Sequence, residues 1–170
     1  MTRAEGVPGA DTRTLQVVRR YLRAGARSAH ELRAFLRKRG VPESTVRSLV
    51  AGSAKLGWLD DETCAKLCSL HWANQGYATD AIRTRLLAKG LDPSVVFRTL
   101  LHLHLAGDDE PRARALVQRR RRGASSGRSA ASSRRTHRHL AGLLARRGFE
   151  QDLIDRVLGQ PSEAADDSRV

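Results

Sequence analysis

The sequence predicts an all-α protein built from three tandem three-helix repeats, each containing a helix-turn-helix, in an elongated array. One pattern occurs three times in the 170-residue chain: an apolar residue recurs four positions later, followed by a basic residue, a glycine and a second apolar stripe. Internal repetition of this kind outweighs any single local signal. Aromatic residues make up only 4% of the chain, so the core is expected to be aliphatic. The three copies read ELRAFLRKRGVPESTV at 31–46, AIRTRLLAKGLDPSVV at 81–96 and HLAGLLARRGFEQDLI at 139–154.

Each copy of the pattern predicts a helix, a glycine turn and a second helix. Two aliphatic residues four positions apart lie on one helical face, and the glycine supplies the positive φ that ends the helix. Ser28 and Glu31 have the spacing of a capping box before the first copy, and Pro42 and Pro93 suit the first turn of the helix that follows. The equivalent residues are Leu32, Leu36, Arg39, Gly40, Val41 and Val46; Ile82, Leu86, Lys89, Gly90, Leu91 and Val96; and Leu140, Leu144, Arg147, Gly148, Phe149 and Ile154.

A further apolar stripe precedes each copy and predicts a third helix per repeat. The stripes consist of Leu15, Val18 and Leu22; Cys64, Leu67, Cys68 and Trp72; and Leu116 with Val117. A unit of this size has a marginal core, so neighbouring repeats are expected to stack. The predicted organisation is a disordered segment at 1–12, repeats at 13–58, 59–107 and 108–159, and a disordered segment at 160–170.

The positive charge of the chain is concentrated in one region. Lysine and arginine number 31 against 18 acidic residues, a net charge of +13, which predicts an anionic partner such as nucleic acid. Twelve arginines and no acidic residue lie between Pro111 and Phe149, and the Gly/Ser-rich stretch at 121–133 is expected to be a mobile loop. Contact with phosphates is the functional hypothesis, and a solvated basic loop without a defined partner is the alternative. The candidate residues are Arg119, Arg120, Arg121, Arg122, Arg134, Arg135 and Arg138.

A second set of basic residues lies at the ends of the predicted repeat helices. These charges could form a discontinuous stripe along stacked repeats. The alternative is that each one only complements the carbonyl end of its own helix dipole. The candidates are Arg37, Lys38 and Arg39; Arg85 and Lys89; and Arg146 and Arg147.

The residue types that could support metal binding or catalysis have simpler structural interpretations. Cys64, Cys68 and His71 share one helical face, but they lack a fourth ligand and CxxC spacing, so the cysteines are expected in the core. The carboxylate clusters at 60–62 and 108–110 stand where helices begin, which favours helix capping over acid–base chemistry. No catalytic motif is present, so no enzymatic activity, cofactor or metal is expected.

The order and spacing of four segments resemble the RecX family of regulatory proteins over residues 13–158. The segments are YLRAGARSAHELRAFLRKRG at 21–40, LGWLDDETCA at 56–65, AIRTRLLAKGL at 81–91 and LARRGFEQDLIDRVL at 144–158. The resemblance implies three-helix repeats and a modulator that lies along the filament of the recombinase RecA on single-stranded DNA. Members often carry an aromatic residue where this chain has Cys64, an arginine near Asn74 and a shorter link before the third copy.

The sequence therefore predicts a monomeric regulator that binds the RecA filament and inhibits or modulates its extension and activity. An autonomous, nonspecific DNA-binding helix-turn-helix protein is the alternative, and a purely protein-binding helical scaffold is a third. No stretch is long and apolar enough for a membrane span, and no signal peptide is recognisable, so a cytoplasmic location is expected.

Overall fold

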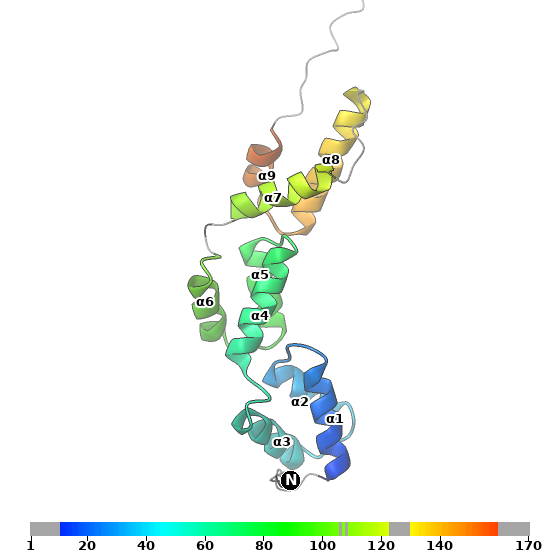
Figure 1. Cartoon of the computed structure of the whole chain (residues 1–170), viewed down its shortest axis with the longest axis vertical. Helices are drawn as coiled ribbons and strands as arrows, with labels where there is room; N and C mark the ends of the chain where they lie inside the picture. The colour runs from blue at the N-terminus through cyan, green and yellow to red at the C-terminus, as the bar shows by residue number, and fades with distance from the viewer. Residues whose placement is uncertain (1–10, 106, 108, 123–129, 160–170) are drawn as a thin grey trace, which may run out of the picture. The chain divides into compact units, whose positions relative to one another are not determined.

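Nine α-helices account for the regular structure of the residues that the computed structural model describes, which are 11–105, 107, 109–122 and 130–159 (Figure 1). These described residues contain no β-strand, so the all-α prediction is confirmed. In chain order the helices form three sets of three, as predicted. The sets are α1 (Thr12–Arg23), α2 (Ala29–Arg37) and α3 (Glu43–Lys55); α4 (Asp61–Asn74), α5 (Thr79–Ala88) and α6 (Pro93–His102); and α7 (Asp109–Arg122), α8 (Ala130–Arg146) and α9 (Gln151–Leu158).

The same turn joins the second and third helices of every set. Gly40, Gly90 and Gly148 have φ values of +72°, +71° and +85°, in the left-handed region that glycine adopts most readily. In each turn the residue after the glycine donates its backbone N–H to a carbonyl five residues earlier, at 3.2 to 3.4 Å. This 6→1 bond is the signature of a Schellman motif. The predicted glycine stops are therefore confirmed in all three copies.

Capping fixes the first residues of the helices. The Ser28 side chain accepts a hydrogen bond from the N–H of Glu31, and Glu31 accepts one from the N–H of Ser28, which confirms the capping box. Asp92 caps α6, with Pro93 at its first position. The expectation of disorder over 1–12 is wrong at its end, because Asp11 accepts the N–H of Thr14 and caps α1. Residues 1–10 and 160–170 lie outside the described residues.

The apolar residues of the repeated pattern are buried, apart from Val41, which is partly buried, whereas the basic residues and glycines of the pattern are exposed or partly exposed. The stripe predicted for α4 is only partly correct. Cys64 is buried, as predicted, but Leu67 is 53% exposed, and Ala65 and Ser69 are also buried. Two cores result. The first contains Val18, Leu32, Leu36, Val46, Leu49, Val50 and Leu59; the second contains Ala78, Ala113, Leu116, Val117, Leu140, Leu143, Leu144, Phe149 and Ile154.

The described residues divide into two compact units. The first unit comprises those of Met1–His71 and Arg83–Leu103, and the second comprises those of Trp72–Ile82 and His104–Val170. The middle set of helices contributes to both, because each unit contains part of α4 and part of α5. The first unit therefore contains the contacts between the first and middle sets of helices, and the second unit contains those between the middle and third sets. We call each group of contacts a junction.

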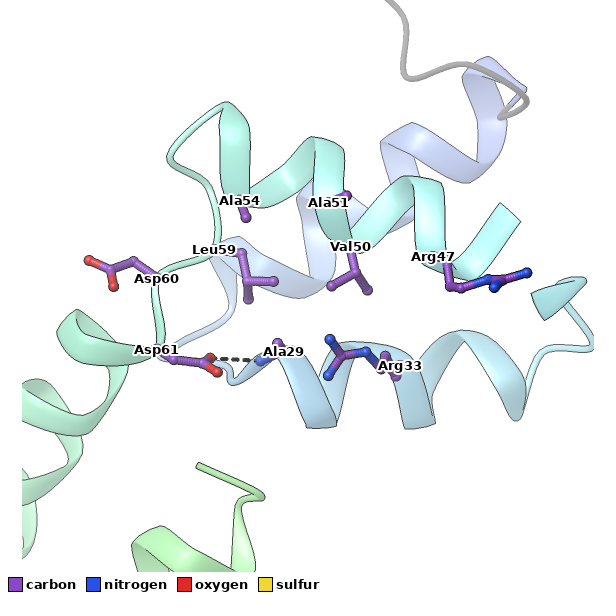
Figure 2. Close-up of a pocket in the computed structure, with 9 residues that line it drawn as sticks. All are labelled: Ala29, Arg33, Arg47, Val50, Ala51, Ala54, Leu59, Asp60 and Asp61. Carbon is purple, nitrogen blue, oxygen red and sulfur yellow. Dashed lines mark hydrogen bonds between the residues drawn. The ribbon is translucent and has the colours of Figure 1, made fainter. Parts of the chain in front are cut away.

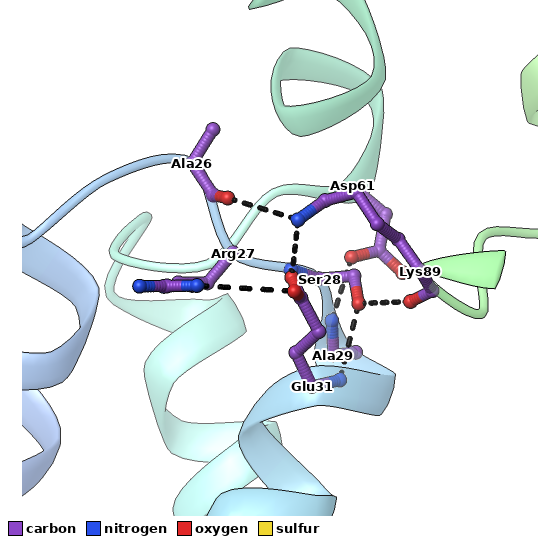
Figure 3. A network of polar contacts seen from close by, with 7 residues as sticks. All are labelled: Ala26, Arg27, Ser28, Ala29, Glu31, Asp61 and Lys89. Carbon is purple, nitrogen blue, oxygen red and sulfur yellow. Dashed lines mark hydrogen bonds and ion pairs between the residues drawn. The ribbon is translucent and has the colours of Figure 1, made fainter. Parts of the chain in front are cut away.

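Within the first unit, the start of α2 meets the starts and ends of helices from the next set (Figure 3). Asp61 at the start of α4 accepts the N–H of Ala29 at 2.8 Å, so it caps α2. The Ser28 hydroxyl donates to the carbonyl of Lys89, the residue after α5, at 2.5 Å. The Lys89 ammonium in turn lies 2.6 Å from Glu31. Hydrogen bonds between residues more than 30 positions apart thus fix this junction.

The second unit repeats this arrangement one set later in the chain. Asp109 at the start of α7 accepts the N–H of Thr79 at 2.9 Å and so caps α5. The N–H of Ala78 donates to the carbonyl of Arg147 after α8, also at 2.9 Å. Ala78 and Arg147 occupy the repeat positions of Ser28 and Lys89. In both junctions, an aspartate at the start of one set caps the second helix of the set before it. The residue before that capped helix donates a hydrogen bond to the carbonyl that follows the second helix of the later set.

The arginine-rich link before the third copy is more helical than expected. The prediction of a loop over 121–133 is wrong at both ends, because α7 extends to Arg122 and α8 begins at Ala130. Arginine and alanine are strong helix formers, so helices anchored in the core continue into the link despite the repulsion between like charges. The middle of the predicted loop, 123–129, lies outside the described residues.

Candidate polyanion-binding surface

The last turn of α7 exposes four consecutive arginines, Arg119 to Arg122. The preceding turns of the helix anchor this turn, because Ala113, Leu116 and Val117 are buried in the core of the second unit. Leu116 and Val117 were the predicted stripe of this helix. Arg121 and Arg122, which were expected in the loop over 121–133, are therefore held on a helix.

The start of α8 exposes Arg134, Arg135 and Arg138. Its later turns bury Leu140, Leu143 and Leu144 in the same core that holds α7. Both arginine groups thus belong to one compact unit and to helices that share a core. Of the seven candidate arginines, Arg121 and Arg122 were predicted in a loop but lie on α7.

A hollow of about 480 Å³ brings together part of these two groups. The guanidinium of Arg119 is fixed at its edge, because Nη1 and Nη2 each donate to the carbonyl of Asn74 at 3.2 Å. The buried side chain of Leu140 supplies an apolar wall. The lining consists of Arg119, Arg120, Arg121, Arg135, Thr136, His139 and Leu140. Arg122, Arg134 and Arg138 lie outside it.

The basic residues at the first repeat turn are engaged in local contacts in two of three cases. Arg37 makes a two-pronged hydrogen bond to Glu43, at 2.8 and 2.9 Å. This contact holds the pKa of the Glu43 carboxyl below its usual range. Arg39 stacks its guanidinium over the Phe35 ring at 3.8 Å. Lys38 is exposed after the end of α2.

The equivalent residues at the other two turns divide between structural contacts and exposed positions. Lys89 is only 16% exposed and pairs with Glu31 (Figure 3), so its charge serves the junction. Arg147 lies over the Tyr77 ring at 4.1 Å. Arg85 and Arg146 are exposed on α5 and α8. Only some of the basic residues in this second set are therefore exposed to solvent.

A second hollow, of about 470 Å³, lies between α2 and α3 in the first unit (Figure 2). Val50 and Leu59 point into it, and its two ends carry opposite charges. Arg33 and Arg47 lie at one end, whereas Asp60 and Asp61 lie at the other. Because of these carboxylates, the hollow is less suited to a polyanion than the one on α7 and α8.

The sequence analysis missed a small basic and aromatic site in the first unit. Arg19, Leu22, Arg23 and Trp58 line a hollow of about 220 Å³. The Arg19 guanidinium lies 5.2 Å from the centre of the Trp58 ring, and Trp58 is 39% exposed. The sequence signal was Arg19 and Arg23, four positions apart beside Leu22 of the first stripe, but their proximity to Trp58 depends on the fold.

The carboxylate cluster at 60–62 caps its own helix, as predicted, whereas in the cluster at 108–110 Glu110 pairs with Arg114. Asp60 accepts the hydroxyl of Thr63 at 2.6 Å and the N–H of Glu62 at 2.9 Å, which lowers the pKa of Asp60. Asp61 and Asp109 cap helices of the preceding set, a role that the sequence analysis did not assign. Asp108 lies outside the described residues.

The two cysteines are neighbours on α4, where Cys64 is buried, as predicted, and Cys68 is partly exposed. The Cys64 thiol donates a hydrogen bond to the Cys68 sulfur, and this bond lowers the pKa of Cys68 to about 7. The same contact and burial raise the pKa of Cys64. Within the described part of the chain, no group of three or more His, Cys, Asp and Glu residues is placed to hold a metal ion.

This thiol pair makes a testable prediction about reactivity. Alkylation of Cys68 by iodoacetamide should become half-maximal near pH 7, because its pKa is about 7 and the thiolate is the nucleophile. In the variant Cys64→Ala the donor is lost, and the midpoint should rise toward the ordinary thiol value of about 8.5. Peptide mass spectrometry after timed quenching gives the rate at each cysteine. An identical midpoint in both proteins would show that Cys64 does not act on Cys68.

Taken together, the fold and this surface define an all-α repeat protein with a cationic face suited to an anionic partner. No helix of the described chain has the length and apolar character required to cross a membrane. No protein-family model matches the chain. Individual relatives do match, and over most of its length.

The chain is 31% identical over 156 residues to "Regulatory protein RecX" of Mycobacterium avium (strain 104), covering 89% of this chain and 86% of the relative. It is 33% identical over 130 residues to the protein of the same name from Stenotrophomonas maltophilia (strain K279a), covering 76% of each. Its fold is similar to the crystal structure of RecX from Lactobacillus salivarius, with a TM-score of 0.61 and 18% identity over 86% of this chain and 93% of that one. This chain belongs to the RecX family of regulatory proteins, so the predicted resemblance is confirmed.

Proposed function

We propose that this protein binds the filament that the recombinase RecA forms on single-stranded DNA, and that it restrains the extension and activity of that filament. Membership of the RecX family carries the proposal. The arginines of α7 and α8 support a contact with the DNA backbone, because they present positive charge from helices rather than from a loop. The protein would act as a monomer in the cytoplasm, without catalysis.

The chemistry of this surface favours phosphate contact over base recognition. Phosphate contacts require positive charge near the backbone and carry no sequence information, whereas base recognition requires side chains placed in a groove. Arginines 119–122 end a helix that is fixed by its buried face, and those of α8 begin one. Among the described residues that line the hollow on α7 and α8 there is no phenylalanine, tyrosine or tryptophan, and His139 is the one ring among them on which a base could stack. Binding is therefore expected to be independent of DNA sequence.

The test is a titration of this protein into RecA that hydrolyses ATP on single-stranded DNA. Inhibition is expected well below one molecule per recombinase subunit, because restraint of filament extension needs few bound molecules. The variant Arg120→Gln/Arg121→Gln/Arg134→Gln/Arg135→Gln should need at least tenfold more protein for the same inhibition if these residues contact phosphates. Substitution is preferred to deletion of the link, because Leu116 and Leu140 on either side share one core.

The alternative, an autonomous DNA-binding protein, predicts a different titration. Inhibition would then begin only when the protein coats all of the free DNA, and its midpoint would follow the DNA concentration instead of the filament concentration. That outcome would contradict the proposal. Full inhibition by the four-arginine variant would leave filament binding intact and remove DNA contact from it.

A further inference from the structure

The hollow on α7 and α8 differs from the rest of the basic surface because several cationic side chains converge on it. The last turn of α7 contributes Arg119, Arg120 and Arg121, and the start of α8 contributes Arg135. Its volume of about 480 Å³ lies within the range of small-ligand sites, which is roughly 300 to 1,000 Å³. Two helices that share a core therefore form a site of defined size.

The charge in this hollow is not neutralised by the protein. In the described part of the chain, none of the ion pairs involves the four arginines that line it. Arg119 is held by the Asn74 carbonyl, a neutral acceptor. A guanidinium has five N–H donors, so Arg119 keeps three for another partner. The hollow thus has fixed positive charge and free hydrogen-bond donors.

The remaining lining residues favour an anion with several oxygen atoms. Thr136 and His139 offer polar side chains from successive turns of α8, and Leu140, which is 2% exposed, excludes water from one wall. Charge-assisted hydrogen bonds are stronger where water is partly excluded. None of the described residues that line the hollow carries a carboxylate, so they are unsuited to holding a cation. A phosphate group, with its tetrahedral oxygens and negative charge, fits these features best.

We propose that the hollow lined by Arg119, Arg120, Arg121, Arg135, Thr136 and His139 is a phosphate-binding site. Its ligand is a group with at least one phosphate, supplied either by a DNA strand or by a free nucleotide. If the phosphate belongs to a DNA strand, the hollow is the place where the protein contacts the DNA, and the inference then rests on the function proposed above. The recognition of phosphate itself does not depend on that function.

The test uses inorganic pyrophosphate as the probe in isothermal titration calorimetry of the full chain. Arg120→Gln/Arg135→Gln removes two charges inside the hollow, whereas the matched control Arg122→Gln/Arg134→Gln removes two charges from the same helices outside it. The inner variant should bind pyrophosphate at least roughly tenfold more weakly than the unaltered protein, because two charge-assisted hydrogen bonds are lost. The control should lose less than about threefold, because it changes only the general field. Circular dichroism should show the same helix content in all three.

Equal losses in the two variants, or no pyrophosphate binding in the unaltered protein, would overturn the proposal. Competition then identifies the source of the phosphate. Displacement of pyrophosphate by oligothymidylate without terminal phosphates assigns the site to a strand, and displacement by ATP alone assigns it to a nucleotide. Displacement by neither contradicts a biological phosphate site. RecA inhibition is measured separately, so failure of the site and failure of the regulatory function give different results.

Discussion

Asp109→Ala is expected to lower the free energy of unfolding by about 3 kcal/mol. Its carboxylate accepts the N–H and the hydroxyl of Thr79 at 2.9 and 2.8 Å, and it lies 3.0 Å from Nη1 of Arg112. The Arg112 side chain is only 10% exposed, so alanine would leave a nearly buried charge without its anionic partner. Arg112 keeps the carbonyls of Tyr77 and Leu105 as acceptors, which limits the loss.

The neighbouring residue provides the control for this prediction. Glu110 pairs with Arg114 in an ion pair whose side chains are 39% and 53% exposed, so Glu110→Ala should have a far smaller effect. Asp109→Asn keeps one carbonyl oxygen and should fall between the two. Urea unfolding followed by circular dichroism at 222 nm measures all three. Similar losses for Asp109→Ala and Glu110→Ala would show that the junction carbonyls alone hold Arg112.

Gly90→Ala is expected to cost about 3 kcal/mol, and Gly40→Ala about 1 kcal/mol. Both glycines have nearly the same φ, +71° and +72°, so alanine meets the same backbone strain at each. They differ in their surroundings: a Cβ at Gly90 would overlap the Cβ and ring of His30, whereas a Cβ at Gly40 has no atom within 4 Å. The additional loss at Gly90 therefore measures the close approach of the α5 turn to α2.

A double-mutant cycle separates this overlap from backbone strain. In a His30→Gly background, the cost of Gly90→Ala should fall to that of Gly40→Ala, because the overlapping atoms are gone. Thermal and urea unfolding give the four free energies. If Gly90→Ala costs the same in both backgrounds, the approach of the turn to His30 is not what constrains position 90.

The helix turns were predictable because all of their determinants lie within a few residues of one another. Leu32 and Leu36, for example, are one turn apart, and Gly40 follows at the position where the left-handed residue is needed. The same local logic identified the capping box of Ser28 and Glu31. Local physics therefore accounts for the helices and for the order of the repeats.

The junctions were not predictable in the same way, because their partners are distant in the chain. Asp61 was expected to cap its own helix, but it caps α2 through Ala29, 32 residues earlier. Lys89 fits a dipole-complementing residue in sequence, and only the fold shows that Glu31 neutralises it. Periodicity shows that repeats exist, whereas the contacts between them depend on tertiary placement.

The arginines of the candidate site could be predicted from the sequence, but the hollow that they line could not. Composition singled out Arg119 to Arg122 and the arginines of α8, because no acidic residue lies among them. The hollow depends on how α7 and α8 meet over Leu140 and on the Asn74 carbonyl that fixes Arg119, and neither has a local signal. The link was predicted to be a loop because its arginines repel one another. Helix propensity and the buried side chains of α7 and α8 outweigh that repulsion at both ends of the link.

The early start of α8 also distinguishes the third set of helices from the first two. In the first two sets, the second helix begins at Ala29 or Thr79, and its first N–H donates a hydrogen bond to an aspartate from the set that follows. The equivalent position in α8 is His137, seven residues inside a helix that begins at Ala130, so its N–H is already committed to the helix itself. An aspartate therefore cannot cap α8 at His137 in the way that Asp61 caps α2 and Asp109 caps α5.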